Sequence, residues 1–368
     1  MDLSRFSRKI LKTTCGLTRG EAVWIDCWDD SLDLANAMAY ECEKMGCHSI
    51  VTERSEKRWL WHIQKGSISS LQAPSPQQHA LLQATDLYIF MLGPPEPIDW
   101  NKVPSSRRKD VTIWFLENNN FVKKWLEIAK SKKIRMVGIE ATIASPSRSK
   151  VLGLEYKSWR KVMFLGCLAD YHEVSRIGHR LKRLLARRRK VRIESTGGTE
   201  LSLELYGKEP ILNDGLATEK KAREGRIVFL PAGDLEVAVK EDSAKGTVIY
   251  DTAIRTRKGI VRELTVRVDK GKVVSYEAAS GGEIFGEYIE RTKGKPGVLS
   301  FMGFGLNPKL KFGFTQDDKV MGGLTIGFGD NYLKGGMNRA AGDWWGSVTE
   351  STVDIDGMRV MQRGEIIC

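Results

Sequence analysis

The residues whose types and spacing could form a functional site lie near the C-terminal end of the chain. They belong to the stretch MGGLTIGFGDNYLKGGMNRAAGDWWGSVTE at 321–350. Its glycines would let the backbone approach a ligand closely or adopt positive φ. The adjacent rings of Trp344 and Trp345 could stack on a planar ligand or a nucleobase. Ordinary turns explain the glycines equally well, and tryptophan is more often part of a core or an interface.

Histidine, the usual zinc ligand, is absent from the C-terminal half of the sequence. The cysteines are scattered and form no CxxC pair, which argues against both a disulfide framework and a zinc knuckle. We therefore expect a reducing, cytoplasmic location. The histidines are His48, His62, His79, His172 and His179, and the cysteines are Cys15, Cys27, Cys42, Cys47, Cys167 and Cys368.

Length and composition are those of a globular protein with more than one domain. The chain has 368 residues, 41% of them hydrophobic, with a mean hydropathy of -0.31. This length favours two domains over a single core. No segment approaches the roughly 18–20 apolar residues of a membrane span, and the start MDLSRFSRKILKTTCGL lacks the apolar core of a signal peptide. We expect no membrane partner.

The formal net charge is +12, and much of it lies in the segment RLKRLLARRRKVR at 180–192. Such a run could bind nucleic acid or another anionic partner. It could equally be a solvated helix, because Leu181, Leu184 and Leu185 have helical spacing and could pack while the cations face water. The candidate anion-binding residues are Arg183, Arg187, Arg188, Arg189 and Lys190.

The elements of the first half alternate between strand and helix. Apolar strand patterns occur at 21–26, 48–53, 86–92 and 134–141, and a helical pattern at 31–46 joins the first two strands. This order predicts right-handed βαβ units and an open, mostly parallel sheet with flanking helices. No GxGxxG or Walker loop follows a strand, so the sequence carries no nucleotide-binding fingerprint.

The second half changes to short alternating segments typical of antiparallel β-structure. Residues 269–272, DKGK, are a natural hairpin turn. The sequence thus predicts an α/β domain at 1–188 and a β-rich α+β domain at 189–368. The predicted strand segments are 201–207, 226–233, 247–254 and 260–277.

Five blocks, in order, resemble the metallo-aminopeptidase family that includes aminopeptidase T and aminopeptidase S. Together with the first two predicted strands, they extend the resemblance over nearly the whole chain. The resemblance implies an aminopeptidase T-like fold, a metal-dependent peptidase activity, a homodimer, and a small-molecule or peptide ligand. The blocks are STGGTELSLELYG at 195–207, LPAGDLEVAVKEDSAKGTVIYD at 230–251, GFGLNP at 303–308, DDKVMGGLTIGFGDNY at 317–332 and NRAAGDWWGSV at 338–348.

The resemblance also implies positions for the ligands of two metal ions, namely two glutamates, two histidines, a tyrosine and an aspartate. Only the tyrosine is kept, as Tyr332. In the order of the chain, the other positions hold Asp234 and Phe301 for the glutamates, Thr325 and Asp343 for the histidines, and Trp345 for the aspartate.

These replacements change the chemistry that the site can support. A two-metal hydrolase holds its ions ~3.5–4 Å apart with several ligands each, and Phe301 and Trp345 replace charged ligands with apolar rings. We therefore expect that the two-metal site does not assemble. Asp234, Tyr332 and Asp343 could still hold one Mg²⁺ or Mn²⁺ through oxygen. Alternatively, both aspartates are solvated and no cofactor binds.

Four further residues are pocket candidates, and three readings of function follow. Asp317, Asp318 and Lys319 match a turn of the family and could equally form a salt-bridged turn, and Trp344 could border a ligand.

The first reading is an aminopeptidase T-like protein without ordinary metal-dependent activity that keeps a ligand pocket between its domains. The second is an amide hydrolase with a reduced, oxygen-only metal site. The third is a basic protein that binds nucleic acid or another anionic partner.

Overall fold

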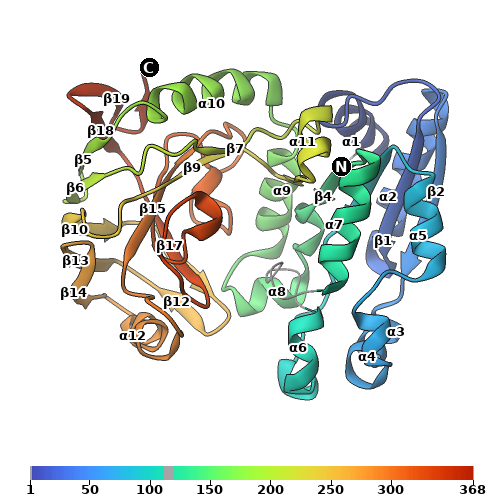
Figure 1. The fold of residues 1–368 in the computed structure, drawn as a ribbon, viewed down its shortest axis with the longest axis horizontal. Coiled ribbons are helices and arrows are strands. Elements are labelled where there is room, and N and C mark those ends of the chain that lie inside the picture. Colours follow the sequence, from blue (N-terminus) through green and yellow to red (C-terminus); the bar gives the residue numbers. More distant parts are fainter. Residues whose placement is uncertain (1, 112–119, 368) are drawn as a thin grey trace. The chain divides into compact units, whose positions relative to one another are not determined.

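The computed structural model describes residues 2–111 and 120–367 (Figure 1). Contacts divide the chain into two compact units, each formed by two segments. Unit 1 comprises Met1–Arg148 and Gly215–Pro231, and unit 2 comprises Ser149–Asp214 and Ala232–Cys368. This division differs from the predicted boundary at 188/189. The difference arises because residues 149–188 belong to unit 2 and residues 215–231 return to unit 1.

Unit 1 contains a five-stranded parallel sheet with the strand order β2-β1-β3-β4-β8. The segment 226–233, predicted as part of the antiparallel half, instead supplies β8, the fifth parallel strand. Its uninterrupted apolar run Ile-Val-Phe-Leu is typical of a strand covered on both faces. The strands are β1 (Ala22–Trp28), β2 (His48–Arg54), β3 (Leu87–Met91), β4 (Arg135–Ile139) and β8 (Ile227–Leu230).

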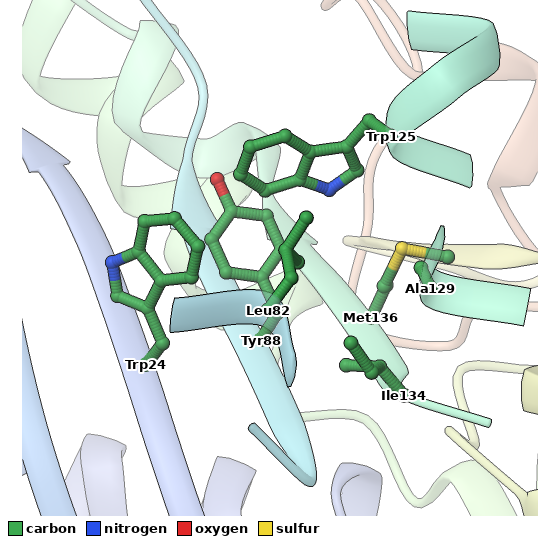
Figure 2. Close-up of a cluster of buried hydrophobic side chains, with 7 residues drawn as sticks. All are labelled: Trp24, Leu82, Tyr88, Trp125, Ala129, Ile134 and Met136. Atoms are coloured by element: carbon green, nitrogen blue, oxygen red, sulfur yellow. The ribbon is translucent and has the colours of Figure 1, made fainter. Parts of the chain in front are cut away.

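Helices flank this sheet, and aromatic side chains fill the space beneath two of them. The buried cluster in Figure 2 joins strands β1, β3 and β4 to helices α5 and α7. The ring centroid of Tyr88 lies 4.9 Å from that of Trp24 and 5.1 Å from that of Trp125. The helices of unit 1 are α1 (Leu3–Lys9), α2 (Leu32–Lys44), α3 (Glu56–Lys65), α4 (Ile68–Leu71), α5 (Pro76–Gln83), α6 (Ser105–Val111), α7 (Asn120–Lys132) and α11 (Glu219–Glu224).

Unit 2 is rich in antiparallel β-structure, so the predicted fold class is confirmed in both halves of the chain. An eight-stranded sheet has the order β14-β13-β10-β6-β5-β18-β19-β20, and a five-stranded sheet has the order β17-β16-β15-β9-β7. The first contains β5 (Lys190–Ser195), β6 (Glu200–Glu204), β10 (Lys245–Tyr250), β13 (Leu264–Asp269), β14 (Lys272–Glu277), β18 (Ser351–Ile355), β19 (Met358–Gln362) and β20 (Glu365–Ile366). The second contains β7 (Ile211–Asn213), β9 (Asp234–Ala238), β15 (Leu299–Gly305), β16 (Leu324–Gly329) and β17 (Asp343–Val348).

A small hairpin and several helices complete unit 2. The hairpin pairs β11 (Ile254–Thr256) with β12 (Gly259–Val261). The predicted turn at 269–272 is confirmed, because Lys270 and Gly271 take positive φ between β13 and β14. The helices are α9 (Tyr156–Gly166), α10 (Tyr171–Leu185) and α12 (Gly282–Arg291), and α8 (Pro146–Val151) spans the junction of the units.

The basic segment begins on α10 and continues into β5. Leu181 and Leu185 are buried and Leu184 is partly buried, which confirms that the leucines pack while Arg183 and Arg187 face solvent. After the helix, the segment is tied to the β18–β19 turn. Arg188 Nη1 donates to the Ile355 carbonyl at 3.2 Å, and the backbone N–H groups of Arg189 and Lys190 donate to the Asp356 carboxylate at 3.1 and 2.9 Å.

Binding of an anionic partner by this segment stays a prediction, and so does the homodimer.

Within residues 2–111 and 120–367, no helix has both the length and the apolar character that a membrane crossing requires.

Candidate functional site

One face of the five-stranded sheet in unit 2 collects the positions that the resemblance singled out. Side chains alternate between the faces of a strand, and residues paired across strands share a face. Glu236 pairs with Gly303, Gly303 with Thr325, and Thr325 with Ser347. The neighbouring row joins Phe301, Gly327 and Trp345, and Asp343 pairs with Gly329. Asp234, Phe301, Thr325, Asp343 and Trp345 therefore all lie on this face.

The ring of Phe301 forms the floor of this face. Its side chain is fully buried. A Cβ atom added at Gly327 would lie 2.1 Å from the Phe301 ring, so only glycine at 327 lets the ring lie flat on strand β16. The glycine-rich sequence of β16 thus has a packing reason.

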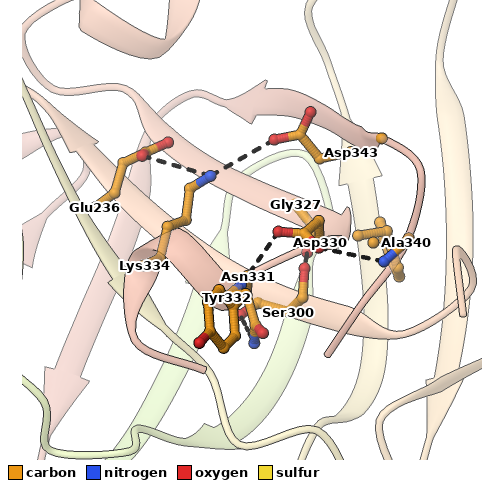
Figure 3. Close-up of polar contacts among 12 residues, drawn as sticks. Glu236, Ser300, Gly327, Asp330, Asn331, Tyr332, Lys334, Ala340 and Asp343 are labelled. Carbon is orange, nitrogen blue, oxygen red and sulfur yellow. Dashed lines mark hydrogen bonds and ion pairs between the residues drawn. The ribbon is translucent and has the colours of Figure 1, made fainter. Parts of the chain in front are cut away.

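Lys334 places its ammonium group over the centre of this face (Figure 3). The Nζ atom lies 3.7 Å from Glu236 Oε2, 3.5 Å from Asp343 Oδ2 and 4.1 Å from the Phe301 ring centroid. The Lys334 side chain is only 15% exposed. A positive charge inside a protein is costly unless opposite charges compensate it, and the two carboxylates do so here. We call Glu236, Phe301, Lys334, Asp343 and Trp345 the Lys334 face.

The charges of the Lys334 face shift one another's pKa values. Burial raises the pKa of Glu236 to about 7, aided by Asp234 and Asp343, although Lys334 and Lys319 act in the opposite direction. Burial alone would lower the pKa of Lys334, but the carboxylates of Glu236 and Asp343 outweigh it, so this pKa is raised. Lys334 therefore remains a cation at neutral pH.

The candidate cation ligands do not converge on one point. Asp234 Oδ1 accepts a hydrogen bond from Asn213 Nδ2 at 3.0 Å, and Asp343 faces the Lys334 ammonium. The Tyr332 side chain points away from that ammonium in Figure 3, and its ring lies 3.2 Å from the Arg339 guanidinium carbon. Among the residues that the structure describes, no group of three His, Cys, Asp or Glu side chains is placed to hold a metal ion.

The surroundings do not fit a zinc or iron centre either. No strand of the five-stranded sheet of unit 2 contains a histidine, Phe301 and Trp345 stand at two of the ligand positions that the resemblance implied, and an ammonium lies between the carboxylates. An oxygen-only site on Asp234, Tyr332 and Asp343 stays a prediction.

The loop that carries Lys334 is held by buried polar groups. Glu241 Oε1 accepts hydrogen bonds from the N–H groups of Met337 at 2.8 Å and Asn338 at 3.0 Å, and from Asn331 Nδ2 at 3.1 Å. Asn331, fully buried, also donates to the Ser300 carbonyl at 2.9 Å. We call residues 330–340 the clamped loop. Its hydrogen bonds fix the direction in which Lys334 leaves the backbone.

Replacing Glu241 with glutamine should loosen the clamped loop and lower the free energy of unfolding by about 1–2 kcal/mol at pH 7, since a charged acceptor is lost. Burial alone would raise the pKa of Glu241, but hydrogen bonds from Tyr206, Met337 and Asn331 lower it below its ordinary value of 4.5. A lowered folded-state pKa stabilises the fold above pH ~4.5, and this contribution is lost as pH falls.

The difference between parent and Glu241→Gln in urea unfolding should therefore shrink below pH ~4.5. The matched control is Asp242→Asn, because the Asp242 side chain is 74% exposed. An equal loss at pH 7 and pH 3, or an equal loss in the control, would contradict the clamp.

Trp344 and Trp345 have different environments. Trp344 is buried among Phe285 and Tyr288, with ring centroids 5.1 and 5.6 Å away, which confirms the core interpretation for this ring. It also borders a pocket of about 190 Å³ beside β17, which Trp345, Ser347, Arg255 and Asp317 line as well.

The turn at 317–319 contributes to both the pocket and the Lys334 face. Burial raises the pKa of Asp317 to about 6, although N–H groups of Gly313 and Phe314 donate to its carboxylate at 3.0 and 3.2 Å. Lys319 is buried, its ammonium donates to Gln316, and its charge acts on Glu236. Asp318 shares the turn and is partly buried.

Sequence reasoning missed Glu236, Lys334, Arg255 and Ser347. Glu236 had a usable signal, because it follows Asp234 by two positions in a strand and so must share its face. Ser347 follows Trp345 in the same way. No sequence signal marked Lys334, since the direction of its side chain depends on hydrogen bonds between its loop and a residue more than ninety positions earlier in the sequence.

Comparisons with known proteins agree with this architecture. The solved structure of a 2,5-dihydroxypyridine dioxygenase from Pseudomonas putida KT2440 resembles the chain with a TM-score of 0.63 and 16% identity, over 100% of this chain and 97% of that one. Wild-type AmpT from Thermus thermophilus resembles it with a TM-score of 0.67 and 16% identity, over 100% and 99%. The predicted aminopeptidase T-like fold is therefore confirmed.

No curated protein matches the sequence. The sequence model of the family NicX, described as 2,5-dihydroxypyridine 5,6-dioxygenase, matches residues 167–368. This match covers more than half of the chain and includes every residue of the Lys334 face. The chain belongs to the NicX family.

Proposed function

We propose that this protein binds a small polar ligand at the Lys334 face without a divalent metal. On this proposal it catalyses neither metal-dependent release of amino acids from peptides nor the ring dioxygenation after which its family is described. The observation that carries the proposal is the Lys334 ammonium, which lies between Glu236 and Asp343 and over Phe301. A fixed cation there competes with any metal ion for the same carboxylates.

The missing imidazoles support the same proposal. Non-haem iron oxygenases typically bind iron through two histidines and one carboxylate. No histidine follows His179 in the sequence, so the strands of the five-stranded sheet carry none. Phe301 and Trp345 add apolar surface where charged ligands were expected.

The geometry of Lys334 also supports ligand binding. Charge-assisted N–H···O bonds are about 2.7–2.9 Å long, whereas its two carboxylate contacts measure 3.7 and 3.5 Å. The ammonium is therefore paired mainly electrostatically, with at most a long hydrogen bond to Asp343, and it keeps N–H donors that suit an acceptor oxygen of a ligand.

Elemental mass spectrometry of protein purified without chelator tests this proposal. The same sample is assayed with 2,5-dihydroxypyridine and Fe²⁺, and with leucine and alanine nitroanilides in the presence of Co²⁺, Zn²⁺, Mn²⁺ or Mg²⁺. We expect metal far below one equivalent and no turnover. Two equivalents with chelator-sensitive turnover would overturn the proposal. One equivalent of Mn²⁺ or Mg²⁺ would also overturn it, in favour of the oxygen-only site at Asp234, Tyr332 and Asp343.

A further inference from the structure

The pocket beside the edge strand β17 is small and closely connected to the Lys334 face. Asp343 and Trp345 belong to both. The pocket volume of about 190 Å³ is similar to that of an engineered cavity of ~150 Å³ that binds benzene. It is therefore large enough for a single small molecule.

The apolar part of the pocket is largely aromatic. Trp345 and Phe314 line it together with Ile254 from the β11 strand. Trp345 and Phe314 are both partly buried, so each ring keeps some surface accessible. Aromatic rings favour contact with another flat, apolar group, which favours a planar ligand body.

Arg255 supplies the positive charge of the pocket. Its Nη1 atom donates to the Leu152 and Gly153 carbonyls at 2.8 and 3.3 Å, and Nε donates to the Gly313 carbonyl at 3.3 Å. These bonds hold the guanidinium plane in place. Within the described residues, Nη2 has no such bond. A guanidinium that is partly removed from water and keeps unused N–H groups is well suited to a carboxylate.

Two buried hydroxyl groups next to the pocket lack hydrogen-bond partners. Ser347 is 1% exposed and Thr325 is 2% exposed, and neither hydroxyl oxygen has a partner in the described part of the chain. They are cross-strand neighbours, and Ser347 lines the pocket. Buried polar groups are nearly always hydrogen-bonded, so an unpartnered pair at a pocket wall points to a polar group supplied from outside the chain.

The acidic residues of the pocket do not exclude one additional negative charge. The Asp317 carboxylate already accepts hydrogen bonds from two N–H groups. Asp343 faces the Lys334 ammonium. Asp317 acts electrostatically on Arg255, but the hydrogen bonds that the described residues give to Arg255 all go to backbone carbonyls, so the guanidinium keeps N–H donors for one ligand carboxylate. A second carboxylate on the ligand would meet Asp343 or Asp317.

We propose that this pocket binds a small planar monocarboxylate. Its carboxylate is held by Arg255 and by the Ser347 hydroxyl, and its flat body lies against Trp345. The inference rests on the proposed metal-free ligand binding and specifies the chemical class of the ligand.

Isothermal titration with benzoate tests the proposal, with benzamide as the neutral analogue and cyclohexanecarboxylate as the non-planar acid. We expect saturable binding of benzoate. Benzamide should bind about tenfold or more weakly, since a charge-assisted hydrogen bond contributes ~1.5–3 kcal/mol. Cyclohexanecarboxylate keeps the charge but loses the flat face that contacts Trp345, and should bind several-fold more weakly. Arg255→Gln should weaken benzoate binding by about tenfold or more. Arg257→Gln is the matched control, because Arg257 lies in the same hairpin and is exposed. This variant should bind benzoate as the parent does.

If Arg255→Gln fails to fold, Ser347→Ala and Trp345→Leu still test the proposal. Each of these variants should weaken benzoate binding several-fold. Absence of saturable benzoate binding, equal binding of benzoate and benzamide, or equal losses at Arg255 and Arg257 would overturn it. Metal content of the same sample separates this inference from the proposed function. If the protein contains no metal and does not bind benzoate, only the carboxylate assignment is refuted. If it contains stoichiometric metal and binds benzoate, only the metal-free proposal is refuted.

Discussion

Replacing Lys334 with methionine should lower the free energy of unfolding by about 1–3 kcal/mol, because Asp343 and Glu236 lose the cation that compensates them. Glu236, whose pKa is about 7 even beside Lys334, then takes up a proton at pH 7. The upper part of the range for buried pairs does not apply, since these carboxyl side chains keep 29% and 40% of their surface exposed. Methionine retains the apolar stem over Phe301, so the loss reports mainly on charge. Urea unfolding at pH 7 measures it.

The same variant should gain a dependence on divalent cations that the parent lacks. Carboxylate oxygens are the ligands that Mg²⁺ and Mn²⁺ prefer, and a cation that binds only the folded state stabilises it by mass action. Added Mn²⁺ should therefore restore part of the stability of Lys334→Met and leave the parent unchanged. Lys334→Arg, which keeps the charge, is the control. If Mn²⁺ stabilises parent and variant equally, the ammonium does not take the place of a metal ion.

Much of this architecture could be predicted because its signals are local. Apolar runs marked strands β1 to β4 of the parallel sheet, and the turn at 269–272 marked the hairpin between β13 and β14. The ordered blocks of the resemblance singled out Asp234, Phe301, Thr325, Asp343 and Trp345, and the structure places them on neighbouring strands. Strand alternation then puts them on one face.

The features that sequence reasoning missed depend on contacts between distant segments. Strand β8 lies within the C-terminal half of the sequence, yet it pairs with β4 of unit 1. An apolar run does not reveal its partner strand, so periodicity alone could not place it. Lys334 depends in the same way on Glu241, whose carboxylate orders the clamped loop. Turn residues indicate that a loop exists, but long-range hydrogen bonds decide where its side chains point.

The charges of the Lys334 face could not be predicted from the sequence either. Counting ligands at inherited positions predicts the loss of a two-metal site, but it does not predict what compensates the remaining carboxylates. In the structure this charge comes from a lysine on a loop, not from any of the positions that the resemblance implied as ligands. A buried carboxylate without a metal needs another positive charge, so a search for a nearby lysine or arginine is the physical step that the resemblance omits.

Phe301→Ala should cause the largest loss of stability among these changes, about 3–5 kcal/mol, because it empties a fully buried aromatic site. Phe304→Ala is the matched control: Phe304 lies on the same strand and is equally buried, but it faces the opposite side of the sheet. The two alanine variants should therefore unfold at similarly reduced urea concentrations. Stability alone does not distinguish the floor of the Lys334 face from ordinary core.

A double-mutant cycle with Lys334→Met makes that distinction. The Lys334 ammonium lies 4.1 Å from the centroid of the Phe301 ring, and a cation over an aromatic face contributes ~0.5–2 kcal/mol depending on its desolvation. Phe301→Ala and Lys334→Met should therefore couple by about 0.5–2 kcal/mol, whereas Phe304→Ala and Lys334→Met should add to within ~0.5 kcal/mol. Equal coupling in both cycles would mean that the ring serves only as core. Coupling confined to Phe301 would mean that its ring helps to hold the Lys334 ammonium between the two carboxylates.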